Sequence, residues 1–267
     1  MKKQVLLIII LIVSVSITLL TIFNFTYTIE GNITDIATGE SVTGVKAIVA
    51  NHEGTTDDKG HYKIKGIKLY QKGDLTINVP EGYLDINPIK IDYSSRLIGK
   101  DFTIEPTIER VVNLVNIALK NNQYDYVWDF THPDVKKYWD SKDEYVTLNK
   151  LVADVIEQKI LRKSIKSINI SGNIRTLDSW KFKTINPGKE YKDILEVPVE
   201  IVYIQNGKEQ PQTELFYYQR VDGFYHFFAS VDKDSLKEMV KLYDVYNKVS
   251  DSELKSIYIN SEKYINK

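Results

Sequence analysis

The sequence predicts an α+β protein of two domains that follow a single transmembrane helix. An uncharged apolar run at residues 5–23 predicts the helix, and closely spaced strand and turn signals predict an all-β domain at residues 28–106. Residues 107–232 combine helical periodicity with a later series of alternating strands, which is typical of an α+β domain. Residues 233–267 form a polar tail with helical periodicity. Residues 1–27 therefore comprise a cytoplasmic stub and the membrane anchor.

The apolar run at residues 5–23 sets the expected location of the chain. A helix of about 20 apolar residues spans the hydrocarbon core of a bilayer. Two lysines precede the run and no basic residue follows it until Lys46, so the positive-inside rule places the short N-terminus in the cytoplasm and residues 28–267 outside. We expect an uncleaved single-pass anchor in a cell membrane, because the run is longer than the core of a signal peptide. Cleavage near Ser14 and Ser16 is the alternative.

Composition and motifs exclude several classes of function. The formal net charge is −1, which gives no electrostatic footprint for nucleic acid. The chain has no cysteine, which excludes a disulfide-stapled fold and a thiol nucleophile. Its four histidines share no metal-ligand spacing, and no nucleotide-binding loop or serine-nucleophile motif occurs. We therefore expect no metal, no cofactor and no catalytic residue.

Short strands separated by turns are expected in residues 28–106. The expected strands are residues 28–35, 45–50, 61–67, 75–80, 89–93 and 102–104. Residues 55–60 form a turn in which aspartates cap the backbone and Gly60 supplies a positive φ. A calcium loop of the EF-hand type needs a longer ladder of ligands that ends in glutamate, and this ladder is missing.

The first half of this β-domain carries a recognisable pattern. A strand that ends in glycine is followed by a D-x-x-T-G-E loop, a G-V strand and a T-D-x-x-G-x-Y turn. The residues that carry the pattern are Gly31, Asp35, Thr38, Gly39, Glu40, Gly44, Val45, Thr56, Asp57, Gly60 and Tyr62. The segment resembles the carboxypeptidase regulatory-like (transthyretin-like) domain. The resemblance implies a seven-stranded sandwich that acts as a spacer or adhesion module and carries no catalytic residues.

Helices precede strands in residues 107–232. Apolar residues recur at helical spacing from Val111 to Leu119, and Ser141 with Glu144 forms a capping box at the start of a later helix. Five apolar residues then alternate over residues 195–203. Asn-Gly and Asp-Gly pairs at 206–207 and 222–223 predict two hairpins. Helices followed by an antiparallel meander indicate an α+β domain.

This order resembles the nuclear transport factor 2-like (cystatin-like cone) superfamily. The supporting residues are the helix end at 119–124, the His-Pro-Asp turn at 132–134 and the hairpin at 220–227. The resemblance implies a cone with a curled antiparallel sheet. It is similar, more narrowly, to the non-catalytic membrane-proximal domain of the methicillin-resistance type of penicillin-binding protein. The transpeptidase motifs S-x-x-K and K-T-G are missing, so that activity is not implied.

Some cones of this superfamily place an acid or base in an apolar pocket, which suggests candidate pocket residues. These candidates are Asp178, Trp180, Tyr203, Tyr217 and His226. A lone histidine among aromatic residues is more often structural, and Trp180 and Tyr203 are most simply core residues. His132, which precedes Pro133, is expected on the surface at a helix start.

The sequence favours a non-enzymatic binding or scaffold protein that contacts a protein partner or a component of the cell envelope. One alternative is a binder or hydrolase of a small molecule or wall glycan that uses the cone pocket. Another is an accessory subunit of an export or conjugation machine. The 18 tyrosines are expected to be strand formers and interface aromatics, with a sugar-stacking surface as the alternative.

Overall fold

The computed structural model describes residues 11, 13–16, 25–182, 188–229 and 233–242. The predicted membrane helix lies largely outside these residues, and no helix within them is long and apolar enough to cross a membrane. The last part of the predicted helical tail, beyond residue 242, also lies outside them. The chain is a mixed α+β, sheet-rich protein that divides into two compact units, Met1–Thr107 and Ile108–Lys267. We call them the β unit and the α+β unit.

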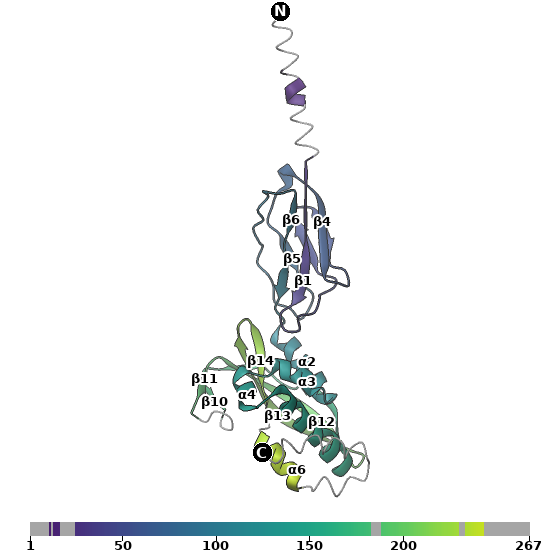
Figure 1. Ribbon diagram of the computed structural model, residues 1–267, viewed down its shortest axis with the longest axis vertical. Helices are drawn as coiled ribbons and strands as arrows, with labels where there is room; N and C mark the ends of the chain where they lie inside the picture. The colour runs from purple at the N-terminus through teal and green to yellow at the C-terminus, as the bar shows by residue number, and fades with distance from the viewer. Residues whose placement is uncertain (1–10, 12, 17–24, 183–187, 230–232, 243–267) are drawn as a thin grey trace, which may run out of the picture. The chain divides into compact units, whose positions relative to one another are not determined.

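The β unit contains two sheets around one core (Figure 1). One sheet has the order β4-β1-β6 with β7 also paired to β1, and the other has the order β3-β2-β5. Inward-facing residues of both sheets, such as Ile29, Ile64 and Ala47, belong to one buried cluster. The elements are β1 (Thr26–Asp35), β2 (Lys46–Val49), β3 (His52–Thr55), β4 (His61–Lys68), the 3-10 helix η1 (Leu69–Gln71), β5 (Thr76–Asn78), β6 (Leu97–Gly99) and β7 (Phe102–Ile104).

The turn before β4 forms as the sequence predicts. Asp57 Oδ1 accepts hydrogen bonds from the backbone N–H groups of Lys59, at 2.9 Å, and His61, at 3.0 Å. These bonds lower the pKa of the Asp57 carboxyl. Gly60 has a φ of 72°, which a glycine adopts without strain. The aspartate therefore serves the turn, as expected.

The predicted strand at residues 89–93 is wrong. The segment makes only an isolated bridge, in which Ile89 exchanges backbone hydrogen bonds of 2.8 and 2.9 Å with Leu75. Its alternating side chains Ile89, Ile91 and Tyr93 nevertheless pack against the core. The alternation of apolar residues shows that one side of the segment is buried. Here the side chains pack on the core although the backbone forms no continuous ladder of hydrogen bonds with another strand.

The sequence did not indicate β3, because its residues His-Glu-Gly-Thr are poor strand formers. Packing explains the choice of residues better than propensity does. A Cβ atom on Gly54 would lie 2.6 Å from the carbonyl oxygen of Lys63 on β4. The glycine lets β3 and β4 approach each other closely.

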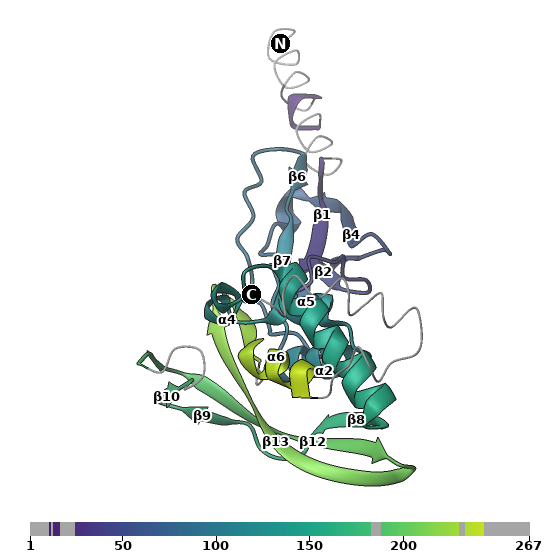
Figure 2. The same ribbon diagram turned by 60° about the horizontal axis from the view of Figure 1, so that its bottom comes forward.

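The α+β unit has helices that lie over one face of a curled half-barrel sheet (Figure 2). The helices are α2 (Ile108–Lys120), α3 (Tyr124–Phe130), α4 (Pro133–Tyr138), α5 (Lys142–Lys150), the π-helix η2 (Leu151–Ile160) and α6 (Lys233–Leu242). The strands are β8 (Lys163–Ile170), β9 (Arg175–Leu177), β10 (Trp180–Lys181), β11 (Glu190–Tyr191), β12 (Ile194–Gln205), β13 (Lys208–Val221) and β14 (Phe224–Phe228). We call the face under the helices the inner face and the opposite one the outer face.

Two tight hairpins fix the register of this sheet. The order is β14-β13-β12-β8, and β9 and β8 both pair with β12. Asn206 and Gly207 have positive φ values of 51° and 76°, and Asp222 and Gly223 have values of 51° and 92°. Both predicted hairpins are therefore confirmed, with the primed turns that match strand twist. Gln205 pairs with Lys208 next to the turn, and this pair fixes the register of all the other pairs between β12 and β13.

Local signals start and end the helices. The Ser141 hydroxyl accepts a 3.1 Å hydrogen bond from the backbone N–H of Glu144, which is one half of the predicted capping box. The other half differs, because the Glu144 carboxylate accepts from the N–H of Asp140, at 2.9 Å. The helix then continues as η2, whose wider turn is closed by a 2.8 Å hydrogen bond from the N–H of Leu161 to the carbonyl of Ile156. Helix α6 buries Leu236 and Val240, and it packs against α5 and η2.

Candidate ligand cavity

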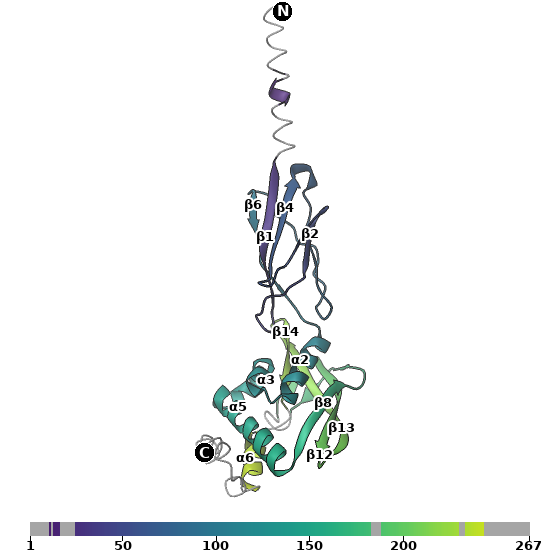
Figure 3. The same cartoon turned by 90° about the vertical axis from the view of Figure 1, so that its right-hand side faces the viewer.

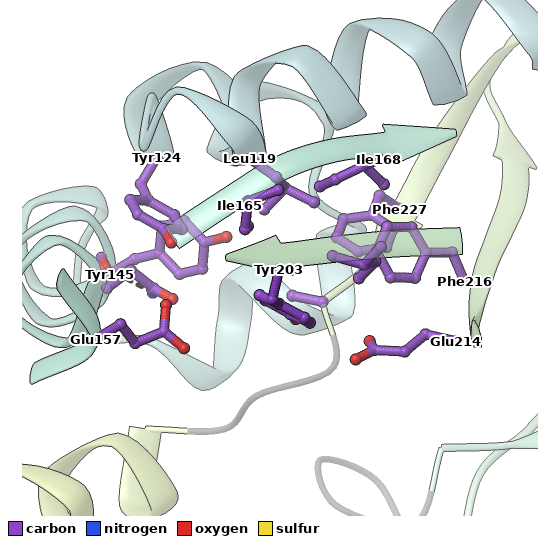
Figure 4. A pocket seen from close by; sticks show the side chains of 13 residues that line it. Leu119, Tyr124, Tyr145, Glu157, Ile165, Ile168, Tyr203, Glu214, Phe216 and Phe227 are labelled. Carbon is purple, nitrogen blue, oxygen red and sulfur yellow. Dashed lines mark hydrogen bonds between the residues drawn. The ribbon is translucent and has the colours of Figure 1, made fainter. Parts of the chain in front are cut away.

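A cavity of about 150 Å³ lies between the helices and the inner face of the sheet (Figure 4). It is partly open to solvent. Its walls are mainly aromatic and aliphatic, with two carboxylates and one amide. The lining residues are Leu119, Tyr124, Tyr145, Asn149, Glu157, Ile165, Ile168, Ile201, Tyr203, Glu214, Phe216, Phe227 and Ala229.

The β12–β13 hairpin supplies one wall of the cavity. Side chains of a strand alternate between faces, and Val199, Ile201 and Tyr203 of β12 point inward. Val199 pairs with Glu214 on β13, so Glu214 shares their face. The pairing of β8 with β12 shifts register between Val202 and Tyr203. The inner face therefore presents Tyr203 near the turn of the hairpin and Glu214 near the middle of β13.

The helices supply the opposite wall, with tyrosines from α3 and α5. Tyr145 is fully enclosed, and its ring centroid lies 5.2 Å from that of Trp128 and 5.1 Å from that of Trp139. Burial raises the pKa of the Tyr145 phenol. The pKa of Tyr124 is raised by burial and then by the nearby charge of Glu157. Both phenols are neutral hydrogen-bonding groups at neutral pH.

Glu157, on η2, is the carboxylate whose environment opposes its charge. Burial raises its pKa, the ammonium of Lys163 lowers it, and the like charge of Glu214 raises it again. Among the described residues, neither Glu157 nor Glu214 forms an ion pair within 4.0 Å. The cavity therefore contains carboxylates with little direct compensation.

Tyr203 lies between the two carboxylates in Figure 4. Burial, Glu214 and Glu157, in that order, raise its pKa to about 12. The Nζ atom of Lys163 lies 3.7 Å from the centroid of the Tyr203 ring. This cation–π contact shows that the ring accepts an ammonium group on its face.

The five candidate pocket residues predicted from the sequence do not meet in one place. Tyr203 lines the cavity. Trp180 and Tyr217 stack on the outer face, with their ring centroids 4.5 Å apart. His226 lies on the same strand face as Phe228, and Asp178 is exposed at the bend before β10. Successive side chains of a strand point to opposite faces, and this sheet has aromatic side chains on both faces. The predicted pocket residues are therefore divided between the two faces.

His226 and His132 form part of the outer-face packing. The ring of His132 stacks on Phe228 at 4.2 Å, and it lies 6.2 Å from the ring of His226. His132 is only 4% exposed, so its expected place on the surface is wrong. The backbone runs beside β14 here, because the N–H of His132 donates to the carbonyl of Phe227 at 2.8 Å. This edge pairing draws the ring into the sheet.

The hydrogen bonds of His132 fix its tautomer. Its Nδ1 atom accepts from the N–H of Asp134 at 3.1 Å, so Nε2 carries the proton and donates to Gln219 Oε1 at 2.9 Å. Burial lowers the pKa of His132. Burial also lowers the pKa of His226 to about 4, and repulsion from protonated His132 and from Lys136 adds to the effect. Both rings are therefore neutral at neutral pH.

Sequence reasoning missed five polar residues of the cavity, Tyr124, Tyr145, Asn149, Glu157 and Glu214. One of them had a usable signal. The Asn206-Gly207 hairpin fixes a register in which Glu214 faces inward beside Val199, and a charged residue at a core-facing strand position is a sign of function. The other four depend on how the helices pack over the sheet.

Comparisons with known proteins add little to this geometry. No protein-family model and no curated protein sequence matches the chain. Among solved structures, it is similar to a protein of unknown function from Bacteroides fragilis NCTC 9343 whose name suggests membrane association, with 11% identity, a TM-score of 0.25 and coverage of 73% of this chain and 99% of that one. It is also similar to a 9R-lipoxygenase from Cyanothece PCC8801, with 10% identity, a TM-score of 0.23 and coverage of 81% and 44%. Scores this low carry no argument about fold or function.

Proposed function

We propose that the chain is a membrane-anchored, extracytoplasmic and non-enzymatic binding protein whose α+β unit holds a small amine-bearing group in the inner-face cavity. The group belongs to a protein partner or a component of the cell envelope. The observation that carries the proposal is the convergence of two carboxylates and three tyrosines on one partly open cavity.

The size of the cavity favours a group rather than a whole ligand. Pockets for drug-sized molecules have volumes of roughly 300–1,000 Å³, whereas a dry cavity of about 150 Å³ holds a molecule the size of benzene. The cavity here has a volume of about 150 Å³. It is therefore suited to one side-chain-sized group of a larger partner.

Charge favours a cation. Glu157 and Glu214 contribute two negative charges, and Lys163 contributes one positive charge that already lies on the Tyr203 ring. An ammonium group that entered the cavity would stabilise the charged form of Glu157, and tyrosine faces attract cations. An anion would meet two carboxylates and only one ammonium group, that of Lys163.

An anchor, a spacer and a cone are the parts that we propose for the rest of the chain. Residues 5–23 anchor the chain with its N-terminus in the cytoplasm, as the run of apolar residues after two lysines favours. The β unit is a spacer of the carboxypeptidase regulatory-like type, supported by its glycine and aspartate pattern and by two sheets that share one core. The α+β unit is a nuclear transport factor 2-like cone, supported by helices over a curled sheet.

The test is ligand-observed NMR with full-length protein in lipid nanodiscs. We expect benzylammonium to give saturation transfer from the protein, and its neutral analogue benzyl alcohol to give much less. The variant Ile165→Phe fills the cavity and should abolish the signal, and a double Glu157→Gln, Glu214→Gln variant should weaken it.

Two matched controls keep the result interpretable. Leu215→Phe adds the same ring on the outer face, and Glu200→Gln removes an exposed carboxylate there. Both should bind as the unmodified protein does. Equal binding of the alcohol and the ammonium would rule out recognition of charge, and binding that survives Ile165→Phe would rule out the cavity.

A further inference from the structure

One end of the β unit carries large apolar side chains that are exposed to solvent. Within residues 25–107, the exposed large hydrophobic residues are Leu69, Tyr70 and Leu97, with exposed fractions of 37%, 60% and 55%. Leu69 and Tyr70 belong to η1, directly after β4, and Leu97 begins β6. A soluble surface normally scatters such residues singly, whereas here they share one end.

The strand ladder shows that this is the end where β1 begins. Thr26 pairs with Lys68, the last residue of β4, and Thr28 pairs with Leu97. Figure 3 shows the start of β1, the end of β4 and the start of β6 at one end of the unit. The opposite end carries the Asp57 turn, because the N–H of Ile33 donates to the carbonyl of Gly60.

Basic side chains surround the apolar ones and lie over aromatic rings. The Nζ atom of Lys72 lies 4.9 Å from the ring centroid of Tyr27 and 5.2 Å from that of Tyr93. The guanidinium carbon of Arg96 lies 4.2 Å from the ring centroid of Phe25. Lys68 Nζ lies 5.9 Å from the ring of Tyr70. Aromatic rings with neighbouring lysine or arginine are the typical composition of a protein surface at a membrane interface.

Two carboxylates lie near the same end, Asp74 beside Gly73 and Asp92 beside Tyr93. Asp92 is engaged in its own turn, where it accepts from the backbone N–H and the hydroxyl of Ser94 at 3.0 Å each. The hydroxyl of Tyr93 joins the two segments by donating to the carbonyl of Gly73 at 2.7 Å. The three cations Lys68, Lys72 and Arg96 therefore outnumber the carboxylates.

We propose that this end, formed by Phe25, η1, Lys72, Arg96 and Leu97, docks onto the outer leaflet of the membrane that holds the anchor. Leu69, Tyr70 and Leu97 enter the headgroup region, and the three cations contact lipid phosphates. The inference rests on the proposed anchor. The apolar run ends at residue 23, and an extended chain covers about 3.5 Å per residue, so the start of β1 lies within roughly 10 Å of the bilayer surface.

Docking would give the β unit a second attachment to the membrane beside the covalent one. A unit held by a single covalent connection can tilt relative to the membrane. A unit that also rests on the headgroups keeps its long strands at a restricted angle to the surface, which suits a spacer.

The test uses single cysteines, because the chain has none of its own. Tyr70→Cys, Leu97→Cys and, at the opposite end, Asp58→Cys are labelled with an environment-sensitive fluorophore in full-length protein. The protein is reconstituted in nanodiscs of phosphatidylcholine and phosphatidylglycerol. We expect the labels at positions 70 and 97 to emit at shorter wavelength and to lose intensity when spin-labelled lipids are added. The label at position 58 should show neither change.

The outcomes separate docking from anchoring. Extraction of the protein from vesicles by alkaline carbonate would overturn the anchor, and the docking proposal with it. Stable integration with labels at 70 and 97 that behave like the label at 58 would overturn docking and leave the anchor intact. Adding Leu69→Ser to the Leu97→Cys protein should reduce quenching, and because Leu69 is exposed, circular dichroism should show an unchanged fold.

Discussion

The two faces of the β12–β13–β14 sheet are both aromatic, yet they differ in how closely their side chains are packed. Phe216 and Tyr217 are neighbours on β13 and point to opposite faces. On the outer face, Trp180 stacks on Tyr217 and its ring lies 5.0 Å from that of Phe228. On the inner face, Phe216 lies 5.1 Å from Phe227 at the edge of the cavity. One face is closed by packing and the other retains space.

Buried carboxylates on the two sides of the sheet also differ in how well their charges are compensated. Glu196, on the outer face, is 6% exposed and forms an ion pair with Arg175, and the hydroxyl of Tyr217 donates to it at 3.3 Å. Burial alone would raise the pKa of Asp134, but hydrogen bonds from Lys189, Lys137 and Tyr191 lower it to about 2. For Glu157, on η2 beside the cavity, burial and the like charge of Glu214 raise the pKa and outweigh the lowering effect of Lys163. A paired carboxylate is compensated in the folded state, whereas a poorly compensated one beside a cavity is typical of a binding site.

The largest expected difference between the faces concerns truncation of the two neighbouring rings. Phe216→Ala removes a fully buried ring and should reduce the free energy of unfolding by about 3–4 kcal/mol. Tyr217→Ala removes a half-buried ring and one hydrogen bond, and it should cost about 1–2 kcal/mol. Denaturant unfolding followed by tryptophan fluorescence measures both, because all three tryptophans lie in the α+β unit. Equal losses would show that the outer face is as much a core as the inner one.

The same two residues show what the sequence could predict. Alternation along β12 and β13, together with two glycine turns, predicts the hairpin register, and that register assigns each side chain to a face. Alternation does not reveal which face keeps space, because the covering elements are distant in sequence. Trp180 reaches Tyr217 only because β10 pairs with β11, where Trp180 lies opposite Tyr191. The cavity itself depends on helices that span residues 108–160.

Helix η2 explains why Glu157 was missed. An α-helix continued from α5 would place Glu157 about two and a half turns after the buried Leu148, on the side facing away from the sheet. The wider π-helical turn rotates the residues after Leu151, and Glu157 comes to line the cavity instead. A pattern read at 3.6 residues per turn could not give this result.

The second prediction concerns pH and the outer face. His226 has a folded-state pKa of about 4, below the usual value near 6.5, so the unfolded chain binds the proton more tightly. Stability due to this group is present above the unfolded pKa and is lost as the pH falls from about 6.5 toward about 4. We expect a loss of about 1–2 kcal/mol in the free energy of unfolding between about pH 7 and pH 5. Buried His132 adds a loss of the same sign.

The variant His226→Gln should flatten this pH dependence, as measured by denaturant unfolding at several pH values with tryptophan fluorescence. The matched control is His61→Gln in the β unit, which should leave the dependence of the α+β unit unchanged. The charge of Lys136 lowers the pKa of His226 and that of Asp222 raises it, so Lys136→Gln should shift the folded-state pKa of His226 slightly upward. An unchanged slope in His226→Gln would show that the buried histidine is not the titrating group.

The smallest expected effect has the opposite sign and bears most directly on function. Burial and Glu214 raise the pKa of Glu157, so its charged form opposes folding at neutral pH. Glu157→Gln should therefore leave the free energy of unfolding unchanged or raise it by a few tenths of a kcal/mol, up to about 1. Glu196→Gln, which removes the paired carboxylate of the outer face, should lower it.

The same denaturant series checks both glutamine variants, with benzylammonium binding measured in parallel. A group that costs stability and is needed for binding is one that the fold retains for its ligand. Because the pKa of Glu157 is raised, its contribution to stability falls as the pH rises through that pKa, and Glu157→Gln should steepen the rise of stability with pH that the histidines cause. If Glu157→Gln were as destabilising as Glu196→Gln, then Glu157 would be a structural residue, and the distinction between a paired outer face and a ligand-binding inner face would fail at the residue on which it most depends.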